Sequence, residues 1–278
     1  MSSAYLLISH GSRDPRPQLA IEKLAELVQV RLATQEAIWT VNNSDRTLTH
    51  SINRSVQQLD AEPTTLSATL ANNRKYPLVG TAVLELAPLP LYEQIQQFAQ
   101  QALDVGCTRL QILPLFLLPG VHVMEDIPQE VALAEASLGH TIAMNLRPHV
   151  GVHPGLINLL ANQLTKVEDC AKILLAHGSR RAGANEPVET IAKQLGAVAA
   201  YWSVSPTMEE QVEAVVRAGY NQISILPYFL FAGGITDAIA QRVTQLQQQF
   251  PEVPLHLGEP MGATAKLAEL IVDLINAE

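Results

Sequence analysis

The stretch LLISHGSRDPRPQLA, residues 6–20, is an apolar run that ends at a histidine, turns through Gly-Ser-Arg and leads into an amphipathic segment. Most of it returns as ILLAHGSRRAGANEP at residues 173–187. An apolar run, a turn and a helix-like segment are typical of one βα unit, and open α/β sheets bind ligands at the carboxyl ends of their strands. The chain therefore places a histidine twice where such sheets hold ligands.

The duplication continues beyond this unit, because DVGCTRLQILPLFLLPG at 104–120 resembles RAGYNQISILPYFLFAG at 217–233. Apolar runs alternate with helical patterns throughout, which is typical of a parallel sheet covered by helices. The predicted strands lie at 4–9, 79–85, 109–114, 141–145, 171–176, 197–202, 222–226 and 254–257. We predict an α/β protein with two tandem domains, residues 1–167 and 168–278, each a mainly parallel four-stranded sheet flanked by helices.

The two copies differ in one long segment. Residues 40–78 are rich in Ser, Thr and Asn and show weak strand or helix periodicity. We predict an insertion between a helix and the next strand of the first domain.

Composition limits the class of protein. Of the 278 residues 47% are hydrophobic and only 16% are charged, which favours a compact protein with a large core. A net charge of -9 without a basic stripe argues against a nucleic-acid partner. No apolar stretch is long enough to span a membrane, no secretory signal is recognisable, and two distant cysteines supply neither a disulfide framework nor an iron–sulfur site. We expect a cytoplasmic protein.

Three side chains of the first copy lie at or just beyond the ends of predicted strands. They are His10 after YLLIS, Glu85 at the end of GTAVLE, and His122 in PLFLLPGVHVMED. The carboxyl ends of parallel strands meet at one edge, so these side chains should converge. Two imidazoles and a carboxylate suit a first-row divalent metal ion and leave room for other ligands.

Each residue also has a structural interpretation when taken alone. His10 could hydrogen-bond a turn, Glu85 could pair at an exposed strand end, and His122 could pack between two valines. Glu125 and Asp126 should stabilise the start of a helix near residue 127, although either could orient His122. The histidines of RPHVGVHPG, His149 and His153, are predicted to be structural.

The second copy lacks two of the three side chains. It keeps His177, but Trp202 aligns with Glu85 and Ile235 aligns with His122. A lone histidine cannot form a three-ligand site, so we predict one active centre, in the first domain, and a degenerate second repeat.

The motifs SHGSRDPR, VLELAPLPLYEQI and LPLFLLPGVHVMEDIP make the sequence resemble the sirohydrochlorin chelatases of the CbiX/SirB type, in their long two-repeat form. The resemblance implies a class II chelatase, a lyase, with two flavodoxin-like domains facing a tetrapyrrole-binding cleft. It implies insertion of Fe²⁺ or Co²⁺ into sirohydrochlorin, in sirohaem or cobalamin biosynthesis. It also implies that His10, Glu85 and His122 handle the metal, with His10 the preferred proton acceptor.

Sirohydrochlorin carries eight carboxylate arms, whereas this protein is acidic, so local donors must bind them. The candidates are Ser12, Arg13 and Arg180, with Arg16 and the amides of the helices that follow the two HGSR loops. The metal is expected as a substrate, with no permanently bound cofactor. A monomer is expected, because two repeats in one chain can form the cleft.

Two other functions remain open at this point. A phosphate-transferring enzyme could use His10 as its nucleophile, although Glu85 and His122 would then be unexplained. A non-catalytic metal carrier would use the same two histidines and glutamate without a tetrapyrrole. The residues do not distinguish Fe²⁺ from Co²⁺.

Overall fold

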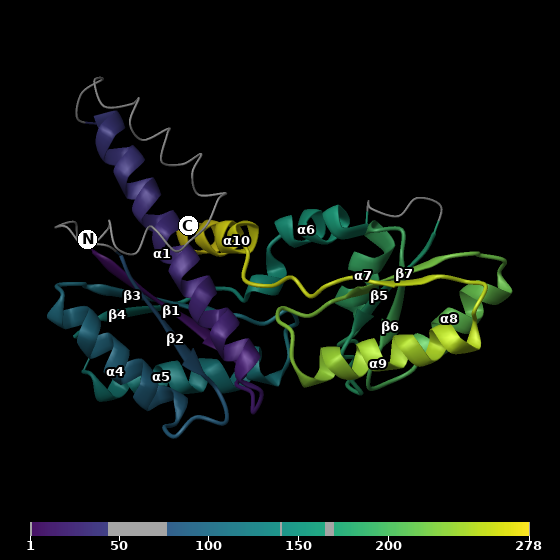
Figure 1. Cartoon of the computed structure of the whole chain (residues 1–278). Helices are drawn as coiled ribbons and strands as arrows, with labels where there is room; N and C mark the ends of the chain where they lie inside the picture. The colour runs from purple at the N-terminus through teal and green to yellow at the C-terminus, as the bar shows by residue number, and fades with distance from the viewer. Residues whose placement is uncertain (1, 44–76, 140, 165–169, 278) are drawn as a thin grey trace.

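The computed structural model describes residues 2–43, 77–139, 141–164 and 170–277. It contains two four-stranded parallel sheets side by side, each covered by helices on both faces (Figure 1). The predicted α/β fold with two similar sheets is confirmed. Most of the predicted insertion, and the predicted domain boundary at 167/168, lie outside the described residues.

The strand order is β2-β1-β3-β4 in the first sheet and β6-β5-β7-β8 in the second. Every predicted strand is present, with ends within two residues of the prediction. The bounds are β1 Ser3–Ser9, β2 Leu78–Val83, β3 Arg109–Pro114, β4 Ala143–Leu146, β5 Ala171–Ala176, β6 Val198–Tyr201, β7 Ile223–Pro227 and β8 Leu255–Leu257.

The central strands are apolar on both faces because helices cover both faces of each sheet. On β1, Leu6 and Ile8 pack into one hydrophobic cluster, whereas Leu7 between them packs into another. All three side chains are almost completely buried. An unbroken apolar run is therefore what the fold requires at this position.

Each strand is followed by a helix. The helices of the first half are α1 Pro15–Asn43, α4 Leu91–Asp104, α5 Ile127–Ser137 and α6 Gly155–Leu164. Those of the second half are α7 Glu186–Gln194, α8 Met208–Arg217, α9 Gly234–Gln249 and α10 Ala265–Asn276. In the described part of the chain no helix has the length and apolarity that crossing a bilayer requires.

The last helix of each half lies on the sheet of the other half. Helix α10 packs against α1 over the first sheet, whereas α6 packs against β7 of the second sheet (Figure 1). Arg147, directly after β4, donates hydrogen bonds to the carbonyls of Leu274 and Ile275 at the end of α10. A cation at this position also opposes the partial negative charge of the helix C-terminus.

This exchange creates one hydrophobic core that runs through both halves. It joins side chains of α1, α6 and α10 to side chains of β5 and α7. Burial of each large apolar side chain stabilises the fold by about 1.5–3 kcal/mol, so separating the halves would cost many such contributions. The two halves are therefore held in a defined arrangement by apolar packing.

We predict that Ile271→Ala, which removes a completely buried side chain of α10, lowers the free energy of unfolding by about 2–5 kcal/mol. Urea denaturation followed by circular dichroism measures the change, and both halves should unfold in one transition. Lys266→Ala on the exposed face of the same helix is the control and should leave the midpoint nearly unchanged. Equal stability of the two variants would contradict the role of α10.

Candidate metal centre

Three neighbouring strands of the first sheet carry the predicted ligands just beyond their carboxyl ends. His10 follows β1, Glu85 lies two residues after β2, and His122 opens a π-helical turn after β3. Strand β1 pairs in parallel with β2 on one side and with β3 on the other. From β1 the chain continues to β2 on one side, and from β2 it crosses back past β1 to β3 on the other side. Ligands of open α/β sheets bind where the strand order reverses in this way.

The loops after β1 and β2 are held against each other. The amide of Glu85 donates to the carbonyl of His10 over 2.9 Å, which extends the strand pairing past the end of the sheet. Gly11 has φ +98°, and a Cβ atom there would lie 2.0 Å from the carbonyl oxygen of Glu85. Only glycine fits this close approach. It keeps the two side chains adjacent.

The three predicted residues are brought together. Nδ1 of His10 lies 4.0 Å from Oε2 of Glu85, and the rings of His10 and His122 meet edge to face with centroids 4.8 Å apart. One ligand atom from each residue lies within 4.8 Å of the other two. Two atoms that bind one ion at about 2.1 Å are at most about 4.2 Å apart, so small side-chain rotations suffice for joint coordination.

The group is accessible rather than enclosed. The side chains of His10 and Glu85 are 51% and 49% exposed. Phe116, after β3, places its ring 6.3 Å from the ring of His10 and 6.2 Å from that of His122. An open group of three ligands can exchange its metal ion, unlike a closed four-ligand site.

The sequence left open whether Glu125 or Asp126 orients His122, and the structure shows that Asp126 does so. Its Oδ2 atom accepts a 2.7 Å hydrogen bond from Nδ1 of His122 across the π-helical turn His122–Asp126. Donation from Nδ1 leaves the lone pair of Nε2 for a metal ion, and carboxylates commonly hold ligating imidazoles in this way. Glu125 is exposed and forms no hydrogen bond or ion pair in the described part of the chain.

His149 and His153 have structural contacts, as predicted. The buried His149 donates from Nδ1 to the carbonyl of Phe116, and burial lowers the pKa of this histidine. Nδ1 of His153 accepts from the amide of Gly155. His149 thereby supports the backbone that carries the ring of Phe116 beside His10 and His122.

Of the three predicted substrate-binding residues, two have free side chains. Arg13 and Arg180 are exposed and form no hydrogen bond or ion pair within the ranges that the structure describes. Ser12 is also exposed, but its Oγ accepts the amide of Asp14 and so helps to form the turn before α1. Their roles in binding remain predictions.

The structure corrects the expectation for Arg16 and for the amides at the start of α1. The guanidinium of Arg16 is bound by Asp14 and Asp237, and its backbone amide donates to Asp14. Pro15 and Pro17 have no N–H group. The first residues of this helix therefore have no free donor for a substrate carboxylate.

The alignment of Trp202 with Glu85 in the sequence analysis is wrong by one residue. The carbonyl of His177 accepts the amide of Ser203 over 2.9 Å, as that of His10 accepts the amide of Glu85. Ser203, rather than Trp202, therefore occupies the position of Glu85. Its hydroxyl donates to the carbonyl of His177, so it is engaged in the turn.

The correction does not create a second group of three potential ligands. Ile235, the counterpart of His122, is exposed and cannot bind a cation. Among the residues that the structure describes, a single group of three potential ligands is found, made by His10, Glu85 and His122.

The sequence matches one family model twice. The model of the CbiX family aligns with residues 54–167 and again with residues 171–278. This chain belongs to the CbiX family. The first match includes Glu85 and His122 but begins after His10. His10 directly follows β1, which pairs with β2 in the same sheet.

Two proteins of Priestia megaterium are similar to this chain. A sirohydrochlorin ferrochelatase is 28% identical over 221 residues, which cover 74% of this chain and 81% of the relative. A sirohydrochlorin cobaltochelatase is 28% identical over 210 residues, which cover 70% and 67%. The structure of SirB from Bacillus subtilis with Fe³⁺ has a TM-score of 0.70 at 17% identity, covers 99% of this chain and 94% of that one, and shows the same fold.

We predict that Asp126→Ala weakens binding of Co²⁺ about 10- to 100-fold, because His122 loses the acceptor that orients its ring. Titration of the protein with Co²⁺, followed by the visible absorption of the bound ion, measures the affinity. Glu125→Ala, one residue away, is the matched control and should bind like the unmodified protein. Unchanged affinity in the Asp126 variant would remove its orienting role.

Proposed function

We propose that this protein inserts a divalent metal ion, Fe²⁺ or Co²⁺, into sirohydrochlorin, a step of sirohaem or cobalamin biosynthesis. The observation that carries the proposal is the convergence of His10, Glu85 and His122 at adjoining strand ends, in a chain of the CbiX family. The ferrochelatase and the cobaltochelatase are both 28% identical to this chain, so we retain both ions as candidate substrates. A cytoplasmic, monomeric enzyme remains our prediction.

Metallation needs ligands that bind the ion and then release it. Two imidazoles and one carboxylate suit Fe²⁺ and Co²⁺, and the incomplete set leaves coordination positions for the pyrrole nitrogens. We assign His122 a fixed position, through its bond to Asp126, and binding through Nε2. Because the group is open, a macrocycle can reach the ion without rearrangement of the core.

The reaction also releases two protons from pyrrole nitrogens. We assign the first acceptance to His10, since neutral imidazole is an effective base near neutral pH. The carboxylate of Glu85 lies 4.0 Å from Nδ1 of His10 and offers a second acceptor. Both side chains are about half exposed, so protons can pass on to solvent.

We assign the two halves different tasks. The first repeat, residues 1–167, supplies the metal ligands, and the second, residues 168–278, supplies surface for the macrocycle. Arg13 follows the HGS turn of the first half and Arg180 that of the second, and both guanidinium groups are free to meet substrate carboxylates. This gives an acidic protein local positive charge on both sides of its substrate.

Phosphate transfer from His10 fits the site poorly. The carboxylate of Glu85 lies beside the imidazole and would repel a phosphate. Arg16 is already bound by two carboxylates, which leaves Arg13 as the free guanidinium of this turn. A metal carrier would share the ligands, but would leave the absorption spectrum of a macrocycle unchanged.

We predict that the protein metallates sirohydrochlorin under anaerobic conditions, seen as a change in macrocycle absorption on adding Fe²⁺ or Co²⁺. His10→Ala, Glu85→Ala and His122→Ala should each reduce the rate severely, with losses that are far from additive, because the three residues act as a unit. The relative rates with the two ions identify the preferred metal. A carrier would bind the ions and leave the spectrum unchanged.

The prediction for His177 tests the single-site assignment. Its neighbours Ser203 and Ile235 supply no metal ligand, so His177→Ala should retain a substantial kcat with at most a raised KM. His10→Ala should nearly abolish insertion. Steady-state metallation by both variants decides the matter, and equal loss of kcat would mean that the active centre uses both repeats.

A further inference from the structure

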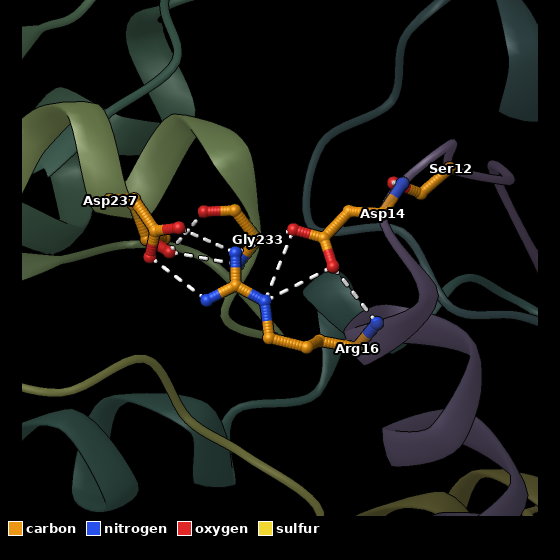
Figure 2. A network of polar contacts seen from close by, with 6 residues as sticks. Ser12, Asp14, Arg16, Gly233 and Asp237 are labelled. Carbon is orange, nitrogen blue, oxygen red and sulfur yellow. Dashed lines mark hydrogen bonds and ion pairs between the residues drawn. The ribbon is translucent and has the colours of Figure 1, made fainter.

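An ion-pair network joins the two halves of the chain (Figure 2). Nε of Arg16 donates to both carboxylate oxygens of Asp14, over 3.0 and 3.1 Å. The Nη1 and Nη2 atoms of Arg16 donate to Oδ1 and Oδ2 of Asp237, over 3.0 and 2.5 Å. Arg16 thus binds one carboxylate of its own half and one of the other half, each through both oxygens.

The network lies between the loops that carry the site and its degenerate counterpart. Asp14 is four residues beyond His10, and Asp237 is two residues beyond Ile235, the counterpart of His122. Gly233, just before α9, is buried, and a Cβ atom there would lie 3.4 Å from Cγ of Pro17. The start of α1 and the start of α9 are therefore in direct contact at the carboxyl edges of the two sheets.

The charged groups of Arg16, Asp14 and Asp237 are already paired with one another. Hydrogen bonds from Arg16 lower the pKa of Asp14 to about 2 and also lower the pKa of Asp237. At neutral pH two carboxylates surround one guanidinium, so the network is no receptor for a further anion. Exposed ion pairs add little to stability, but arginine bound through both carboxylate oxygens fixes direction and distance.

We propose that Arg16 and Asp237 are positioning residues that set the separation of the two carboxyl edges between which the macrocycle binds. The inference rests on the proposed function, because it needs a rigid substrate that contacts both halves. A preformed separation reduces the ordering cost of binding, which otherwise weakens affinity. The network should therefore act mainly on substrate binding rather than on the chemical step.

A second ion pair supplies a matched control. Arg31 donates to Glu269 over 2.5 Å and so also joins the two halves, through α1 and α10. The exposed fractions, 42% and 48%, are close to those of Arg16 and Asp237, 46% and 52%. Arg31 is 15 residues beyond Arg16 on α1, about 22 Å along the helix.

The test uses the full chain and the variants Arg16→Ala, Asp237→Asn and Arg31→Ala. Without this contact the two edges must be ordered when the substrate binds, so the first two variants should raise KM for sirohydrochlorin about tenfold and change kcat less than about twofold. Arg31→Ala should keep both constants. Arg16→Lys keeps the charge but loses the two-pronged geometry, and should give an intermediate KM.

The direction in which KM changes in Asp237→Asn distinguishes a positioning role from a simple effect of charge. This variant removes a negative charge beside a polyanionic substrate, so charge alone would lower KM, whereas loss of positioning raises it. The double variant Arg16→Ala with Asp237→Asn should be no worse than the poorer single variant, because both disrupt one contact. A lowered or unchanged KM for Asp237→Asn, or an equal rise for Arg31→Ala, would overturn the proposal.

A binding measurement without metal separates this inference from the proposed function. The affinity for metal-free sirohydrochlorin, followed by macrocycle absorption, should fall in the Arg16 and Asp237 variants even if no metallation occurs. Binding without metallation in the unmodified protein would defeat the proposed function alone. Absence of binding would defeat both, and equal binding by all variants would defeat the positioning role alone.

Discussion

The exchange of α6 and α10 between the two sheets is the constraint on which the other features depend. Because each last helix packs on the opposite sheet, one hydrophobic core holds both halves. This packing keeps the start of α1 beside the start of α9, where Arg16 reaches Asp237. The apolar core supplies the stability, and the exposed ion pair supplies local geometry that non-directional apolar packing does not specify.

The order and positions of the strands were predictable because they follow from strong local signals. Both faces of each central strand are buried, so the apolar runs are unbroken, and the second copy repeats the first. The helix exchange had no such signal. The apolar faces of α6 and α10 indicate burial, but the same face would suit either sheet, and the partner depends on contacts such as Arg147 with the end of α10.

The convergence of His10, Glu85 and His122 was predicted because parallel strands place their carboxyl ends together, which requires only the strand assignment. Finer details depend on backbone conformation. A shift of one residue after β6 places Ser203 opposite His177, and only hydrogen bonding reveals it. The π-helical turn at His122 brings the carboxylate of Asp126 to Nδ1 of the imidazole. Arg16 was misassigned because its partner Asp237 lies 221 residues away in the sequence.

The two HGSR turns share one arginine and differ at another position. Arg13 and Arg180 occupy the same position in the two turns, and both remain free of partners in the described structure. Arg16 has no such counterpart, because Gly183 stands at the equivalent position. A substrate with carboxylates on all sides needs positive charge from both halves, whereas a contact that spaces the halves is needed only once. Under the proposed function, the two repeats therefore share the arginine assigned to the substrate and differ at the residues assigned to the metal and at the contact between the halves.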